Sequence, residues 1–114
     1  MERKIGEEIM NRKKIYISIP ITGHDIEKVK MHAEEAKKKL TAQGYDSITP
    51  FDVCSEEGHT YAYYMGRDIE ALLQCDAIYM CAGWVNSKGC KAELLTANVY
   101  NKEIMYERKD ETYL

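Results

Sequence analysis

The sequence has no long hydrophobic run, no cysteine-pair motif and no large excess of charge, and each absence excludes a class of protein. No segment approaches the ~20 consecutive apolar residues that a membrane-spanning helix needs. The first residues, M-E-R-K-I-G-E-E, contain no apolar signal-peptide core. The net charge of −3 gives no electrostatic reason to bind a nucleic-acid polymer or an anionic membrane. We therefore expect a cytoplasmic protein that binds neither a nucleic-acid polymer nor a membrane.

The four cysteines and three histidines are not spaced as a metal site. No C-x-x-C pair occurs, and no histidine stands at zinc-finger spacing. We expect reduced thiols, as in the cytoplasm, and no metal ligand among His24, His32 and His59. Neither G-x-x-x-x-G-K-[ST] nor G-x-G-x-x-G is present, so the usual triphosphate loop and dinucleotide fingerprint do not apply. We expect no cofactor.

The chain of 114 residues is long enough for one domain with a normal core. Residues 1–12 are mostly charged and predict an N-terminal arm that is mobile or weakly helical. Residues 13–107 carry the alternation of apolar and polar segments expected of a folded domain. Residues 108–114 form a polar tail. There are no repeats and no low-complexity tracts.

Strands and helices alternate along the domain. Short β-branched or apolar runs predict strands at residues 14–19, 45–50, 75–82 and 102–107. Helical spacing predicts helices between Asp25, a suitable N-cap, and Gly44, a suitable stop, and at residues 60–74 and 88–101. The first helix has a predicted buried stripe of Ile26, Val29, Ala33, Ala36 and Leu40.

This order predicts an α/β fold of three layers, a Rossmann- or flavodoxin-like parallel sheet of four to five strands with helices on both faces. Ligands of such sheets bind beyond the carboxyl ends of the strands. Three loops reach that edge: residues 20–24, 51–59 and 83–89.

Asp68 is placed unusually on the second helix. At 100° per residue it falls within an apolar arc, between Tyr64 and Leu72. A buried carboxylate must be paired, hydrogen-bonded, protonated or at the mouth of a cleft. Two interpretations remain open: a functional acid, or a structural partner of Arg67, Lys88, Lys91 or a loop backbone.

The segment W-V-N-S-K-G-C-K-A-E, residues 84–93, leaves an apolar strand and opens a helix. Ser87 and Gly89 could cap the helix and admit a tight turn, or their hydroxyl and N–H groups could bind an anion. Glu93 is favoured in the first turns of a helix by the macrodipole, and could equally be a solvated surface group. Nine tyrosines stand against one phenylalanine, and Tyr61, Tyr63 and Tyr64 cluster before Asp68. We expect most tyrosines to be half-buried packing residues whose hydroxyl reaches water, while one or two could stack on a planar ligand.

Four motifs in this order and spacing form a resemblance: Y-I-S-I-P-I-T-G at 16–23, G-R-D-I-E-A-L at 66–72, C-D-A-I-Y at 75–79 and N-S-K-G-C-K-A-E at 86–93. The chain resembles the DUF4406 family of the nucleoside 2-deoxyribosyltransferase-like superfamily. It is similar, more distantly, to the 2′-deoxynucleoside 5′-monophosphate N-glycosidases. The likeness spans about residues 14–107.

The resemblance implies an enzyme that cleaves the N-glycosidic bond of a 2′-deoxynucleoside or its 5′-monophosphate, or transfers the deoxyribosyl group. It assigns Glu93 as nucleophile, ionised, and Asp68 as acid/base with a raised pKa. Tyr16 would orient the nucleophile. The implied substrate-binding residues are Ile19, Pro20, Ile21, Thr22, Gly23, Asn86, Ser87 and Gly89.

Two departures from the family pattern favour an alternative. Ile19 stands where relatives usually have glycine, and Lys91 replaces a small residue two positions before Glu93. An inactive nucleotide-binding or sensor module of the same fold would fit these changes, and a purely structural α/β protein is a third possibility. The resemblance and the short sheet edges imply a homodimer or higher homo-oligomer.

Overall fold

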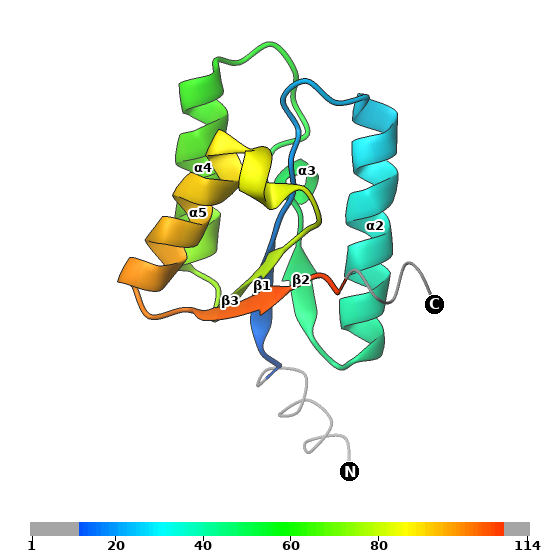
Figure 1. Ribbon diagram of the computed structural model, residues 1–114, viewed down its shortest axis with the longest axis vertical. Coiled ribbons are helices and arrows are strands. Elements are labelled where there is room, and N and C mark those ends of the chain that lie inside the picture. The colour runs from blue at the N-terminus through cyan, green and yellow to red at the C-terminus, as the bar shows by residue number, and fades with distance from the viewer. Residues whose placement is uncertain (1–11, 109–114) are drawn as a thin grey trace.

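In the computed structural model, residues 12–108 are described, and they form one parallel sheet between two layers of helices (Figure 1). The strands are β1 (Lys14–Ser18), β2 (Asp46–Ile48), β3 (Ala77–Met80) and β4 (Glu103–Tyr106). The helices are α2 (Ile26–Ala42), α3 (Pro50–Val53), α4 (Tyr61–Leu73), α5 (Lys88–Val99) and the 3-10 helix η1 (Trp84–Asn86). The sheet order is β2-β1-β3-β4, and every pair is parallel. The predicted arm and tail lie, apart from Arg12 and Arg108, outside the described residues.

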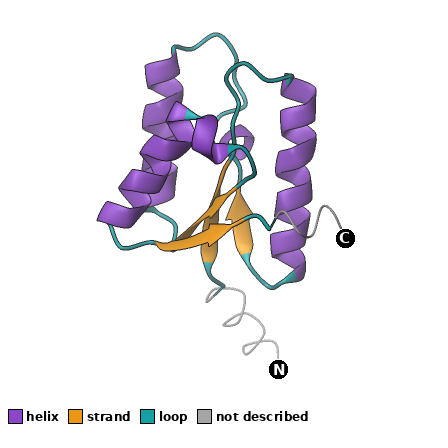
Figure 2. Cartoon of the chain, in the orientation of Figure 1, coloured by secondary structure: helices purple, strands orange, loops and turns teal. Residues whose placement is uncertain are grey.

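The two faces of β1 build two cores, which confirms the predicted three layers (Figure 2). Ile15, Ile17 and Ile19 point to one face and pack with the buried stripe of α2. Tyr16, in between, points to the opposite face, where residues of α4 and α5 cover the sheet. Successive side chains of a strand alternate between faces, so Ser18 lies on the same side as Tyr16.

Side-chain caps fix where the helices begin. Asp25 accepts hydrogen bonds from the N–H groups of Glu27 and Lys28, and Thr60 accepts one from Tyr63. After α2 the chain reverses at Gly44, whose φ of 90° suits a residue without a Cβ. These features confirm the predicted helix ends. The prediction that Ile26 belongs to the buried stripe is wrong: its side chain is 43% exposed at the helix start.

Two single-turn elements were not predicted. Thr49 and Asp52 form a capping box, and Pro50 occupies the first turn of α3. The strand predicted to run to residue 50 therefore ends at Ile48, because proline cannot donate to a strand ladder and is suited to the start of a helix. The other element, η1, follows Gly83, whose φ is 91°. Turns this short give no helical periodicity.

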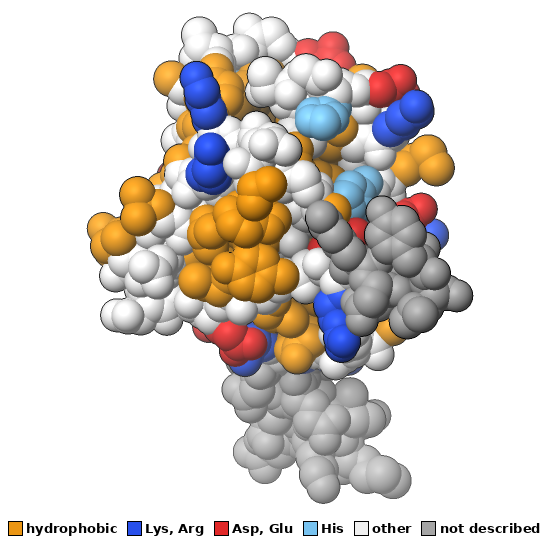
Figure 3. Space-filling model, viewed as in Figure 1, with side chains coloured by type: hydrophobic (Ala, Val, Ile, Leu, Met, Phe, Trp, Pro, Cys, Tyr) orange, Lys and Arg blue, Asp and Glu red, His pale blue; other side chains and the backbone are white. Residues whose placement is uncertain are grey.

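Apolar side chains gather in the middle of the face seen in Figure 3. Among the exposed large apolar residues are Val85 and Tyr106, and the ring of Tyr106 lies 5.7 Å from that of Trp84, centroid to centroid. No helix within residues 12–108 is long and apolar enough to cross a membrane.

Candidate active site

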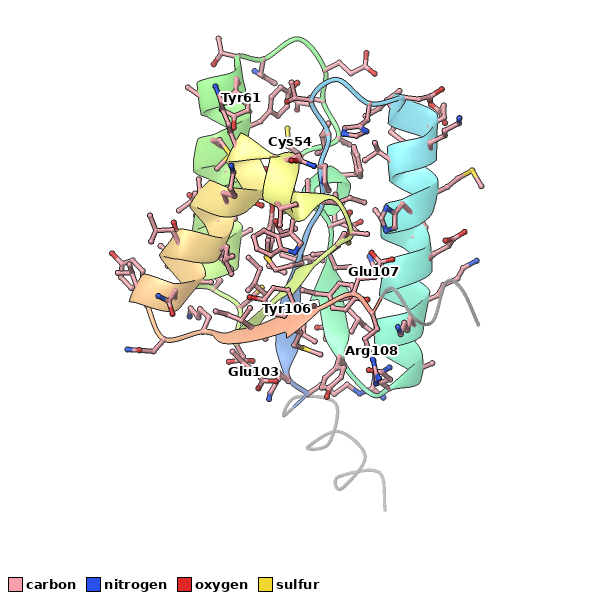
Figure 4. All side chains as sticks on the ribbon, viewed as in Figure 1. Cys54, Tyr61, Glu103, Tyr106, Glu107 and Arg108 are labelled. Carbon is pink, nitrogen blue, oxygen red and sulfur yellow. The ribbon has the colours of Figure 1, made fainter. Side chains whose placement is uncertain are left out.

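A cavity of about 640 Å³ opens beyond the carboxyl ends of the strands. All three loops that the sequence placed at this edge contribute to its wall, together with side chains of α4 and α5. The wall includes Ile19, Pro20, Ile21 and Thr22 from the first loop, Phe51, Cys54 and Glu56 from the second, and Asn86, Ser87 and Gly89 from the third. Figure 4 shows Cys54 and Tyr61 at this end of the molecule. The volume is in the range of small-molecule sites.

Glu93 reaches this cavity from the second turn of α5 and is only 4% exposed. The hydroxyl of Tyr16 donates to Oε2 at 2.8 Å, and the hydroxyl of Ser18 donates to Oε1 at 2.6 Å. Tyr16 and Ser18 are two positions apart on β1, so both side chains face α5. Each carboxylate oxygen therefore has its own donor, and the side chain is held in one orientation.

Asp68 lines the same cavity from α4 and is 9% exposed. Burial raises the pKa of this carboxyl to about 6, while hydrogen bonding with Tyr16 lowers it. Within residues 12–108, no lysine or arginine forms an ion pair with Asp68. The described residues therefore do not support the interpretation that Asp68 is a structural acid neutralised by a lysine or arginine.

The pKa of Glu93 is raised to about 7, chiefly by burial and also by the negative charge of Asp68, against the lowering effect of the Ser18 and Tyr16 hydroxyls. The resemblance implied an ionised Glu93 and an Asp68 with a raised pKa. In the structure, burial raises the pKa of both carboxyls, so the ionised form of Glu93 is disfavoured as well. Two carboxyls that interact in this way titrate as a pair.

Tyr16 connects the two acids. Its side chain is fully buried, and its pKa is raised well above the usual 10 by burial and by the charges of Glu93 and Asp68. The phenol therefore stays protonated near neutral pH. Its hydroxyl donates to Glu93, and its hydrogen bonding with Asp68 lowers the pKa of that carboxyl. This arrangement favours a pair that carries one proton in total.

The loop before α5 combines capping with access to the cavity. Ser87 is the N-cap of α5, and its hydroxyl accepts a hydrogen bond from the N–H of Cys90 at 3.1 Å. A Cβ at Gly89 would lie 3.2 Å from the hydroxyl oxygen of Tyr61, tighter than ordinary contact. Gly89 thus lets the first turn of α5 approach α4. Both residues, with Asn86, also line the cavity.

Four positions singled out from the sequence differ in their relation to the wall. Gly23 lies in the turn after β1 with a φ of 83°, and Tyr16 lies beneath the cavity, so neither is among its lining residues. Ile19 is in the wall and 5% exposed, so its side chain does fill space there. Lys91 is exposed and outside the wall, so it adds no charge to the cavity.

Sequence reasoning did not single out Ser18, which holds Glu93, or several residues of the wall. Ser18 is a polar side chain in an apolar strand, two positions from Tyr16, and this spacing was the available signal. Lys30, Phe51 and Met65 come from helices and loops that only the fold brings together. Of the three tyrosines considered for stacking, Tyr61 and Tyr64 line the wall and Tyr63 does not. Lys30 lies over the Phe51 ring, 5.8 Å from its centroid.

Comparisons with known proteins support the fold and the family. A comparison with curated proteins found no match. The structure is similar to "2-desoxiribosyltransferase from Leishmania mexicana", with a TM-score of 0.64 and 21% sequence identity. The similarity covers 82% of this chain, which spans 63% of the length of that protein. Residues 13–106 match the family described as "Domain of unknown function (DUF4406)". The chain therefore belongs to the DUF4406 family.

Proposed function

We propose that this protein cleaves the N-glycosidic bond of a 2′-deoxynucleoside or its 5′-monophosphate, and passes the deoxyribosyl group to water or to a second base. One observation carries this proposal: Glu93 and Asp68, from two helices, line one cavity and both lie against the hydroxyl of Tyr16. The likeness of the fold to a protein titled a deoxyribosyltransferase supports the choice of substrate.

The first chemical step needs one ionised and one protonated carboxyl. Because the pKa of Glu93 is the higher of the two, the reactive form is the less populated one, in which the shared proton has moved to Asp68. Glu93 in its ionised form attacks C1′ of the sugar, and the bond between C1′ and the base nitrogen breaks. The electron pair of that bond leaves with the base, which takes a proton from Asp68. The product is a deoxyribosyl ester of Glu93.

The second step regenerates the site. Water or a second base attacks C1′, Asp68 accepts the proton that the nucleophile loses, and the ester bond to Glu93 breaks. Glu93 leaves as a carboxylate, again hydrogen-bonded to Tyr16 and Ser18. The hydroxyls favour the ionised form, so they assist its departure and hold it in line for the next attack.

The remaining wall suits a nucleoside. Tyr61, Tyr64 and Phe51 offer aromatic surface for a planar base. Ser87 and Lys88, at the N-terminus of α5, offer donors and positive charge where a 5′-phosphate would be favoured.

The alternative is a binding module without turnover. Ile19 supports it, because its buried side chain occupies wall space where relatives have glycine. Lys91 does not support it, because its side chain is outside the cavity. The two functions differ in whether bound nucleotide releases its base.

The test is to incubate the protein with each deoxynucleoside and deoxynucleoside 5′-monophosphate and to separate free base by chromatography. We expect release by the wild type and its loss in Glu93→Gln. Release that is unchanged in Glu93→Gln would refute the proposed nucleophile. Binding without release in the wild type would establish the alternative.

We also propose a homodimer. The edge strands β2 and β4 are short, and the exposed Tyr106 at the end of β4 lies against Trp84, next to the exposed Val85 in η1. Sedimentation at micromolar concentration should give twice the chain mass, and a monomer would contradict the proposal.

A further inference from the structure

A second group of reactive side chains lies on the α2 side of the sheet, away from the two acids. His32 comes from α2, Cys81 directly follows β3, and Glu107 directly follows β4. One ligand atom of each, an imidazole nitrogen, the thiol sulfur and a carboxylate oxygen, lies within 4.8 Å of the other two. None of the three belongs to the wall of the large cavity.

We propose that His32, Cys81 and Glu107 form a binding site for Zn²⁺ or a divalent ion of similar preference. Imidazole, thiolate and carboxylate are the three side-chain ligands that zinc takes in proteins. Bonds of about 2.0–2.3 Å in a tetrahedral arrangement place ligand atoms about 3.3–3.8 Å apart. His32 Nε2 and the Glu107 oxygen are 2.7 Å apart and all three atoms lie within 4.8 Å of one another, so rotation of side chains would bring them to this spacing.

Other contacts hold the ligands in place. The Glu107 carboxylate accepts a hydrogen bond from the N–H of Ala82 at 2.7 Å, and His32 Nε2 lies 2.7 Å from the same oxygen. A ligand carboxylate oriented by a backbone donor is the support that metal sites require. Figure 4 shows Glu107 between the end of β4 and α2.

There is also room for a fourth ligand. A smaller cavity of about 140 Å³ borders His32 and Glu107, and Glu35, Lys39 and Arg108 also line it. This volume exceeds that of a water molecule, which could complete a tetrahedron around the ion. The side chains of His32 and Glu107 are 33% and 21% exposed, so an ion has a path to the site from solvent.

Binding would tie together three elements that are distant in sequence. The ion would join α2 to the ends of β3 and β4, and the Cys81 thiol would lose its proton to solvent as the metal–sulfur bond forms. The sequence predicted that no histidine binds a metal. It could not show this group, because the three ligands occur on separate elements with no recognisable spacing.

The experiment uses the full chain, freed of metal with a chelator and titrated with Co²⁺ as a spectroscopic substitute for Zn²⁺. We expect one equivalent to bind, with the near-ultraviolet band of thiolate-to-cobalt charge transfer and visible bands of tetrahedral Co²⁺. Added Zn²⁺ should abolish these bands, and Zn²⁺ alone should raise the Tm, since it binds only the folded chain.

Variants locate the site. Cys81→Ser should remove the charge-transfer band, and His32→Gln should weaken binding by more than the about 10–100-fold expected for loss of an outer contact. Cys75→Ser, at another buried free thiol, is the matched control and should bind like the wild type. Circular dichroism of the metal-free variants checks folding.

A titration without the thiolate band would overturn the site, as would binding that survives both Cys81→Ser and His32→Gln. Binding that is lost instead in Asp68→Asn would place the ion at the large cavity and likewise overturn it. Base release is measured separately, so failure of the metal site leaves the proposed function unaffected.

Discussion

Replacing Glu93 with glutamine should make the fold more stable at alkaline pH while it removes the proposed nucleophile. The pKa of Glu93 is raised from its usual 4.5 to about 7, chiefly by burial. Between these values the folded state binds more protons than the unfolded state, so stability falls as the pH rises. The contribution of Glu93 to the free energy of unfolding is therefore fully present below about pH 4.5, and it is completely lost above about pH 7.

The size of the effect follows from the same values. The interval from 4.5 to about 7, at about 1.36 kcal/mol per pKa unit, corresponds to about 3 kcal/mol. Since whole domains have stabilities of about 5–15 kcal/mol, this is a large fraction. Glutamine is nearly isosteric and cannot ionise, and the hydroxyls of Tyr16 and Ser18 can rotate to meet its amide. Glu93→Gln should therefore gain about 2–3 kcal/mol at pH 9 and close to nothing at pH 5.

The assay is urea unfolding of wild type and variant at pH 5 and pH 9. The matched control is Glu70→Gln on the exposed side of α4, which should change stability by no more than about 0.5 kcal/mol at either pH. A variant less stable than the wild type at pH 9, or equally stabilised at both pH values, would show that Glu93 is not a carboxyl whose ionisation burial opposes.

Further predictions concern the same pair of acids. The kcat/KM for base release should follow a narrow bell with limbs at about 6 and about 7, because the singly protonated pair is active, and a plateau through alkaline pH would contradict this. Ser18→Ala should lower kcat/KM by about 10–100-fold, because it removes a hydrogen bond to a charged group. It should also move the alkaline limb of the pH profile to higher pH, because the Ser18 hydroxyl lowers the pKa of Glu93. Ser47→Ala is its control, since this buried hydroxyl on β2 has no partner within the described residues and should be dispensable. Asp68→Asn should lower the pKa of Glu93, since it removes a nearby negative charge, and should slow base release by about 10²–10⁴-fold.

The parts of the fold that were predictable are those encoded locally. The stripe of Val29, Ala33, Ala36 and Leu40, with a capping Asp25 before it and Gly44 after it, specifies α2 within about twenty residues of sequence. Asp68 could be singled out for the same reason, because the neighbours that make its position apolar lie one or two turns away on its own helix.

Glu93, in contrast, could not be identified from its neighbours in the sequence. Nothing in α5 distinguishes it from a solvated acid near the start of a helix, and it is held by the hydroxyls of Tyr16 and Ser18, which lie 77 and 75 positions away in the chain. The family resemblance, not the pattern of α5, pointed to it. The raised pKa of Glu93 could not be predicted from the sequence either, because it depends on how closely β1 and α4 pack around the carboxyl.

The central claim is that Glu93 and Asp68 act on one sugar carbon, and it is tested most directly by trapping the ester. A deoxynucleoside with fluorine at C2′ slows formation and breakdown of the covalent intermediate, because fluorine disfavours the oxocarbenium-like transition state. Intact mass spectrometry should show one fluorodeoxyribosyl group added per chain, and peptide mapping should place it on Glu93, with no addition in Glu93→Gln. Addition at another residue, or base release by the wild type that is retained in Glu93→Gln with no adduct, would contradict the claim.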